Sequence, residues 1–70
     1  MVEGDKAKLR TLLAHWIEHN KEHGQEFKDW AEKANALWET KAGEDMLAAA
    51  AEMDRANEAL SRALRRLGVG

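Results

Sequence analysis

The chain has 70 residues, no cysteine and no proline, and 34% of its residues are charged, with a formal net charge of −2. This size allows one domain, residues 1–70, and the lack of cysteine excludes disulfides, thiol catalysis and iron–sulfur clusters while fitting a reducing compartment such as the cytoplasm. Acidic and basic residues are interleaved and no apolar run is long enough to cross a bilayer, so we expect neither nucleic acid nor membrane as a partner.

The first predicted helix covers about residues 5–19. Asp5 suits its N-cap, because the carboxylate accepts hydrogen bonds from the free amides of the first turn. An apolar stripe with helical spacing follows, made of Leu9, Leu12, Leu13, Trp16 and Ile17. Asn20 falls in the middle of this stripe, where an unpaired amide is costly. A break at Asn20 avoids that cost and is preferred; the alternative ends the helix at Gly24.

Two further helices are predicted, over about residues 21–41 and 44–67. In the second helix, steps of four and three relate His23, Phe27, Trp30, Ala34, Leu37 and Lys41. In the third helix, the same steps relate Met46, Ala50, Met53, Asn57, Leu60, Leu64 and Leu67. Ala42 and Gly43 are the predicted stop between the two helices. Short connections make neighbouring helices antiparallel, so the predicted fold is an all-α, up-down-up three-helix bundle.

All three histidines recur at every fourth position, as His15, His19 and His23. Imidazoles one helical turn apart can bind one transition-metal ion, and nitrogen ligands favour zinc, nickel, copper or cobalt over magnesium and calcium. The predicted register brings Asn57 and Glu58 to the same end of the bundle. These two side chains are candidates for an additional ligand or for acceptors of the imidazole N–H groups.

The histidine block also carries a resemblance. The string His15-Trp-Ile-Glu-His19-Asn20-Lys-Glu-His23 precedes Phe27 and Trp30-Ala31, and the last predicted helix contains Ala56-Asn57-Glu58. Over most of residues 9–64 this pattern resembles a family of small prokaryotic helical domains of uncertain function, loosely associated with metal handling. The resemblance implies that the histidines, Asn57 and Glu58 belong to one site. Gly24 departs from the pattern, which has a helix-forming residue there.

Two functions are compatible with these features. The first is a non-enzymatic transition-metal-binding module that uses the histidine cluster. The second is a structural or protein-interaction helical bundle that self-associates into a homo-oligomer without metal, with the histidines as surface residues, Asn57 fixing the register of the seam and Glu58 pairing with Arg62. Catalysis is not expected, because Ser61 lies far along the chain from every histidine and there is no glycine-rich loop.

Overall fold

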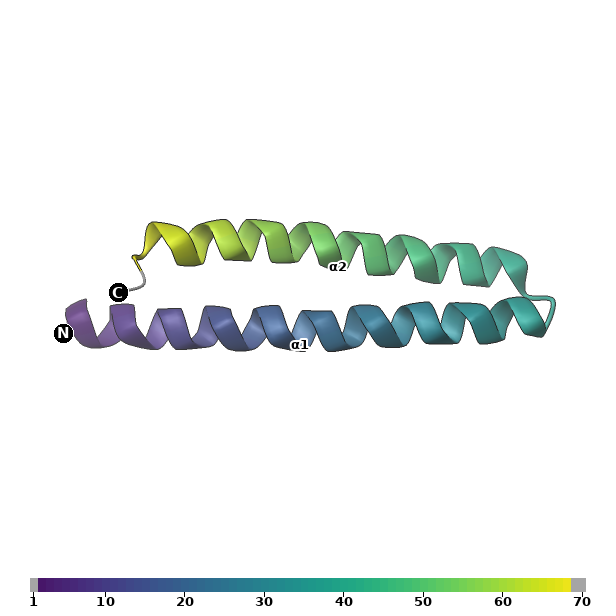
Figure 1. Cartoon of the computed structure of the whole chain (residues 1–70), viewed down its shortest axis with the longest axis horizontal. Helices are drawn as coiled ribbons and strands as arrows, with labels where there is room; N and C mark the ends of the chain where they lie inside the picture. Colours follow the sequence, from purple (N-terminus) through teal and green to yellow (C-terminus); the bar gives the residue numbers. More distant parts are fainter. Residues whose placement is uncertain (1, 69–70) are drawn as a thin grey trace.

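The computed structural model describes residues 2–68, which form one antiparallel helical hairpin (Figure 1). Helix α1 is Val2–Ala36 and helix α2 is Thr40–Arg66. The two helices lie side by side in a body with extents of 54 × 16 × 14 Å. The all-α prediction is confirmed, but the three-helix bundle is wrong, because an uninterrupted α1 replaces the first two predicted helices.

Helix α1 is uninterrupted because the amide of Asn20 has a partner on α2. Nδ2 of Asn20 donates a hydrogen bond to Oδ1 of Asn57 at 3.0 Å, and Nδ2 of Asn57 donates to the carbonyl oxygen of Ile17 at 3.1 Å. Paired in this way, the amide carries no desolvation cost that a helix break would have to remove. The predicted break at Asn20 is therefore wrong, and so is the alternative end at Gly24.

Gly24 lies inside the helix–helix interface. A Cβ atom built there would meet Cβ of Met53 at 3.7 Å, an ordinary contact distance. The buried or half-buried seam residues of α1 are Leu13, Ile17, Asn20, Gly24, Phe27, Ala31 and Ala34. Of the series predicted from His23, Phe27 and Ala34 lie in the seam. Two other positions are wrong by one residue: Gly24 and Ala31 take the places predicted for His23 and Trp30, and Leu37 lies in the turn.

The predicted seam of α2 is confirmed. Every member of the series from Met46 to Leu67 is buried or half-buried. Levels across the interface follow from two contacts, since Asn20 lies opposite Asn57 and Gly24 lies opposite Met53. Near the open end of the hairpin, a guanidinium nitrogen of Arg10 donates to the carbonyl oxygen of Leu67 at 3.4 Å, which keeps the same register.

The turn occupies residues 37–39, several residues before the predicted stop at Ala42 and Gly43. The amide of Glu39 donates to the carbonyl oxygen of Ala34 at 2.8 Å, and the amide of Trp38 donates to that of Asn35 at 3.0 Å. This pair of bonds is a Schellman motif, and Trp38 occupies its left-handed position with φ of 66°. A glycine usually marks that position, so the sequence carried no clear signal for the turn.

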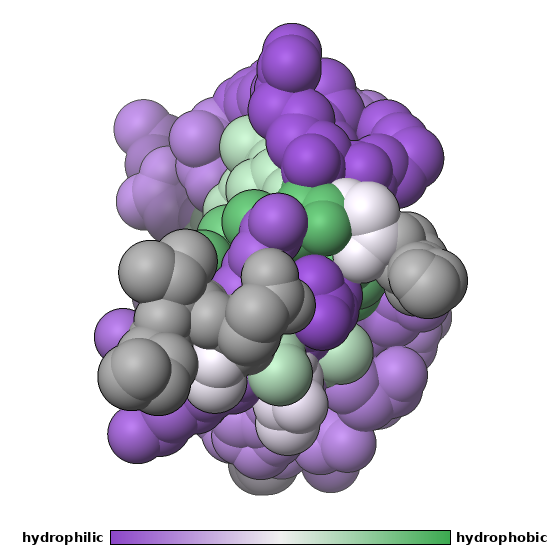
Figure 2. All heavy atoms as spheres, turned by 90° about the vertical axis from the view of Figure 1, so that its left-hand side faces the viewer, coloured by the Kyte–Doolittle hydropathy of each residue, from purple (hydrophilic) through white to green (hydrophobic). Residues whose placement is uncertain are grey.

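The single hairpin has a thin core. Among the residues described, the buried apolar side chains are Leu13, Ala31 and Ala50. Viewed from the end that carries the termini, apolar atoms lie between the helices and polar atoms cover the outer surfaces (Figure 2). Large apolar side chains are nevertheless exposed at Leu9, Trp16, Trp30, Leu37, Trp38 and Leu47. Within residues 2–68, neither helix has a segment both long and apolar enough to cross a bilayer.

Candidate functional site

The three histidines lie on successive turns along one flank of α1. The rings of His15 and His19 are stacked with centroids 5.8 Å apart, and the rings of His19 and His23 meet edge to face at 4.4 Å. His15 and His19 are exposed, whereas His23 is half-buried beside the seam. The cluster therefore belongs to the surface of a single helix and not to a junction between two helices.

His19 and His23 form a hydrogen-bonded pair, with their Nε2 atoms 2.9 Å apart. Nδ1 of His23 lies 3.1 Å from Oε1 of Glu26. A carboxylate only accepts, so Nδ1 of His23 carries the hydrogen; Nε2 of the neutral ring then accepts from Nε2–H of His19. This assignment follows from the hydrogen-bond partners, and it leaves His23 with both ring nitrogens engaged.

The predicted metal-binding group is not assembled in this structure. Among the described residues, which include all three histidines, no group of three or more His, Asp or Glu side chains could hold a metal ion. The nitrogens of His23 already have partners in His19 and Glu26. The prediction that one chain gathers these side chains into a metal-binding group is therefore wrong. Transition-metal binding as such stays a prediction, because no comparison tests it.

Asn57 and Glu58 do not join the histidines. Asn57 is 8% exposed, and its side-chain amide is hydrogen-bonded to Asn20 and to the carbonyl oxygen of Ile17 inside the seam. Glu58 is exposed and lines a shallow polar pocket together with Ile17, Lys21, Asp54, Asn57, Ser61, Arg62 and Arg65. A separate hollow contains His19, Glu22, His23, Gln25, Glu26 and Asp29. The convergence predicted from a three-helix register is therefore wrong.

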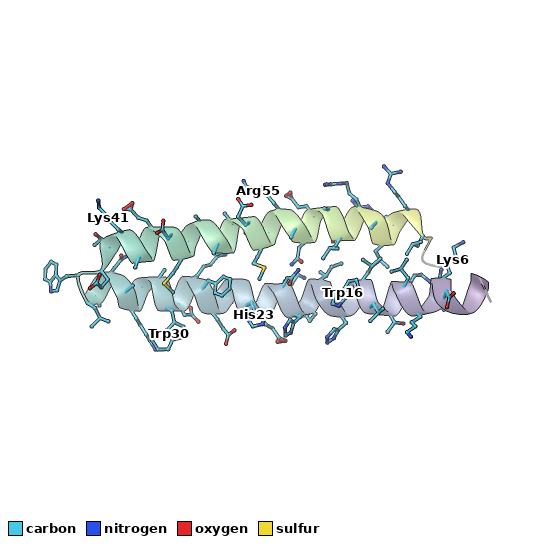
Figure 3. The ribbon with its side chains drawn as sticks, turned by 180° about the vertical axis from the view of Figure 1, so that it is seen from behind. Lys6, Trp16, His23, Trp30, Lys41 and Arg55 are labelled. Carbon is cyan, nitrogen blue, oxygen red and sulfur yellow. The ribbon has the colours of Figure 1, made fainter. Side chains whose placement is uncertain are left out.

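A second feature of α1 was visible in the sequence and was missed. Steps of seven residues relate Leu9, Trp16, His23, Trp30 and Leu37, which we call the heptad stripe. Each of the four members within α1 directly precedes a buried or half-buried residue on the α2-facing side, and Leu37 follows at the start of the turn, so the stripe flanks the seam along α1. Figure 3 shows Trp16, His23 and Trp30 following one another along this helix. Apart from half-buried His23, every member is exposed, from 40% at Leu9 to 70% at Leu37.

Helix α2 carries a matching series of small residues at the same spacing. These are Ala42, Ala49, Ala56 and Ala63, which we call the alanine row. Two antiparallel helices are related by a local two-fold axis, so equivalent flanking positions lie on the same side of their seam. The heptad stripe and the alanine row therefore share one side of the hairpin. The opposite side carries a polar pocket lined by Lys21, Asp54 and Ser61.

Comparison with known families gives one match, to a domain of unknown function named DUF8180, over residues 9–67. The chain belongs to the DUF8180 family. The match covers nearly the whole hairpin, from the first member of the heptad stripe to the last seam residue of α2. Its description names no activity, ligand or metal, so the resemblance is confirmed only as a small domain of unknown function. Comparisons with curated proteins and with solved structures found no match.

Proposed function

We propose that this chain is a structural and protein-interaction module that acts by self-association, with two hairpins packed into a four-helix bundle. The observation that carries this proposal is the exposed surface of the single hairpin, 5446 Å². A compact monomer of 7.9 kDa exposes about 4,400 Å² by the usual scaling of surface with mass. The hairpin therefore exposes roughly 1,000 Å² more than a chain of its size that folds alone.

That excess is the area a stable dimer needs. If each of two copies covers it, the pair buries about 2,000 Å² in total, at the lower end of the range for obligate homodimers. Self-association also supplies the core that the single hairpin lacks, because a domain of this length without disulfides needs oligomerisation, a metal or dense packing to be stable. Exposed Trp16 and Trp30 are the large apolar groups that such an interface would cover.

The proposal requires no catalytic group and no cofactor, in keeping with a module whose activity is assembly. A cytoplasmic location belongs to the same proposal, and it is supported by a chain without cysteine. The surface of α1 that carries His15, His19 and His23, which we call the histidine face, then lies along the heptad stripe.

Sedimentation equilibrium across a range of concentrations, with melting followed by circular dichroism, tests the proposal. We expect the mass of two chains and a melting temperature that rises with concentration, because association stabilises only the folded state. A one-chain mass at every concentration, with a melting temperature independent of concentration, would overturn it.

A matched pair of variants tests which surface associates. Trp30→Lys and Gln25→Lys each add one positive charge to an exposed position of α1, but only Trp30 belongs to the heptad stripe. We expect Trp30→Lys to give the one-chain mass and Gln25→Lys to keep the two-chain mass. Equal masses for the two variants would place the interface elsewhere.

A further inference from the structure

We infer that a second copy of this chain docks antiparallel on the face formed by the heptad stripe and the alanine row, with the two-fold axis of the dimer passing beside His23. This inference rests on the proposed self-association and adds the surface, the orientation and the register. Its occupant is a second copy because the stripe is complementary to itself in sequence and because the two halves of the hairpin carry opposite net charges.

The heptad stripe reads the same in both directions. From Leu9 to Leu37 its order is leucine, tryptophan, histidine, tryptophan, leucine, with His23 at the centre. A closed dimer with two-fold symmetry pairs each surface patch with its own copy, so residue i contacts j and j contacts i. A two-fold axis at His23 therefore sets Trp16 against Trp30 of the second copy and Leu9 against its Leu37. Like meets like along the entire stripe.

The face has one row of large residues and one row of small residues. The register of the seam places Ala56 and Ala49 on either side of the level of His23, so the small residues run parallel to the large ones. The tryptophans make a ridge on α1, whereas the alanine row of α2 presents methyl groups. Rotation about the two-fold axis sets α1 over α1 of the second copy and α2 over its α2, so tryptophan meets tryptophan and alanine meets alanine. Lys33, whose Nζ lies 4.2 Å from the ring centroid of Trp30, steadies the ridge.

Charge selects the antiparallel orientation. Asn20 lies level with Asn57, so a plane through the middle of the hairpin separates residues 23–54 from the rest of the chain. The half with the turn has eight acidic and three basic residues, net −5, and the half with the termini has five acidic and eight basic residues, net +3. Antiparallel copies place the acidic half of one beside the basic half of the other. Parallel copies would place like charges together, which is unfavourable.

Single cysteines can map this interface, because the chain has none of its own. His23→Cys puts the thiol beside the proposed axis, where two copies approach closely enough for a disulfide; Glu22→Cys puts it one residue away on the exposed side of α1. Under mild oxidation we expect His23→Cys to form a disulfide-linked dimer and Glu22→Cys to stay largely monomeric on a non-reducing gel. Sedimentation of His23→Ala checks that removing the imidazole leaves the dimer intact.

Two more cysteines fix the orientation. Trp16→Cys and Trp30→Cys should each fail to cross-link alone, and they should form a mixed disulfide when the two variants are combined. Cross-linking of Trp16→Cys with itself would show parallel copies and overturn the inference. So would equal cross-linking at positions 22 and 23, since random collision then suffices. In both cases a two-chain mass for the unaltered protein leaves the proposed function standing, whereas a one-chain mass removes both.

Discussion

Two hydrogen-bonded side-chain pairs of the hairpin are alike in geometry and opposite in consequence. The amides of Asn20 and Asn57 are hydrogen-bonded at 3.0 Å, and the imidazoles of His19 and His23 at 2.9 Å. The amide pair joins residues 37 positions apart inside the packed seam, whereas the imidazole pair joins residues four positions apart on one helix surface. The first pair sets how the two helices align. The second pair joins two residues of one helix and has no effect on that alignment.

Access to water explains the difference. Asn57 is 8% exposed, while the His23 side chain is 41% exposed. A buried amide that loses its partner cannot turn to solvent and keeps its desolvation penalty, but a surface imidazole exchanges one hydrogen bond for another with water. The length of a hydrogen bond therefore says little about its contribution to stability. Its burial and the segments it joins say much more.

The largest expected effect comes from breaking the buried amide pair. We expect Asn57→Leu to lower the free energy of unfolding by about 2 kcal/mol, because it leaves the amide of Asn20 in the seam without its acceptor. The double variant Asn20→Leu with Asn57→Leu should recover most of that loss, since no polar group is then stranded. Urea unfolding of the single and double variants measures the coupling between the two positions.

His19→Ala serves as the control for this comparison. It removes an equally short hydrogen bond from the exposed face, and we expect a change within about 0.5 kcal/mol. If Asn57→Leu costs no more than His19→Ala, the amides are solvated and the seam does not depend on them.

A smaller effect, of opposite sign at two positions, should distinguish the two glycines of the seam. A Cβ atom at Gly43 would lie 2.5 Å from Oδ1 of Asn35 and 3.1 Å from the carbonyl oxygen of Ala31. We expect Gly43→Ala to cost about 1 kcal/mol, the lower end of the range for overpacking, since the Asn35 side chain can turn aside but a backbone oxygen cannot. Gly24→Ala meets only Met53 at contact distance and should stabilise the hairpin by about 0.5–1 kcal/mol through helix propensity.

Thermal melting of the two alanine variants at matched concentration measures both changes. A gain in stability from Gly43→Ala would mean that the helices are less closely packed near the turn than the structure shows. A loss from Gly24→Ala would mean that they approach more closely at its middle.

The sequence correctly predicted features that depend on the spacing within one helix. It did not predict features that depend on contacts between the two helices. The heptad of α2 was correct because its spacing is a local property, and so was the placement of the histidines on successive turns. The prediction of a break at Asn20 was wrong because a sequence shows a polar residue in an apolar stripe but not the side chain that hydrogen-bonds to it. The turn misled because Trp38 adopts a left-handed conformation that glycine usually signals, while the glycine at position 43 lies inside α2.

The predicted gathering of Asn57 and Glu58 with the histidines was wrong for the same reason. Bringing Asn57 and Glu58 to the histidines required a register between three helices, and an error of one residue at His23 moved the predicted seam off Gly24. The heptad stripe, by contrast, needed only the recurrence of large residues in steps of seven. That signal was present in the sequence, so the surface proposed to associate could have been found from the sequence alone.

The smallest expected effect concerns metal on the histidine face. Within the described residues no three ligands are gathered to hold an ion, and both nitrogens of His23 already have partners, so an ion would have to displace existing hydrogen bonds. We therefore expect stoichiometric Zn²⁺ to move the melting temperature of chelator-stripped protein by less than about 2 °C, far below the several degrees that a saturated site confers on a domain of this size. His15→Ala, which leaves the bonds of His23 to His19 and Glu26 in place, should melt like the unaltered chain with and without the ion. A rise of several degrees that disappears in both His15→Ala and His19→Ala would contradict this expectation, because it would show the three imidazoles leaving their present partners to gather around one ion.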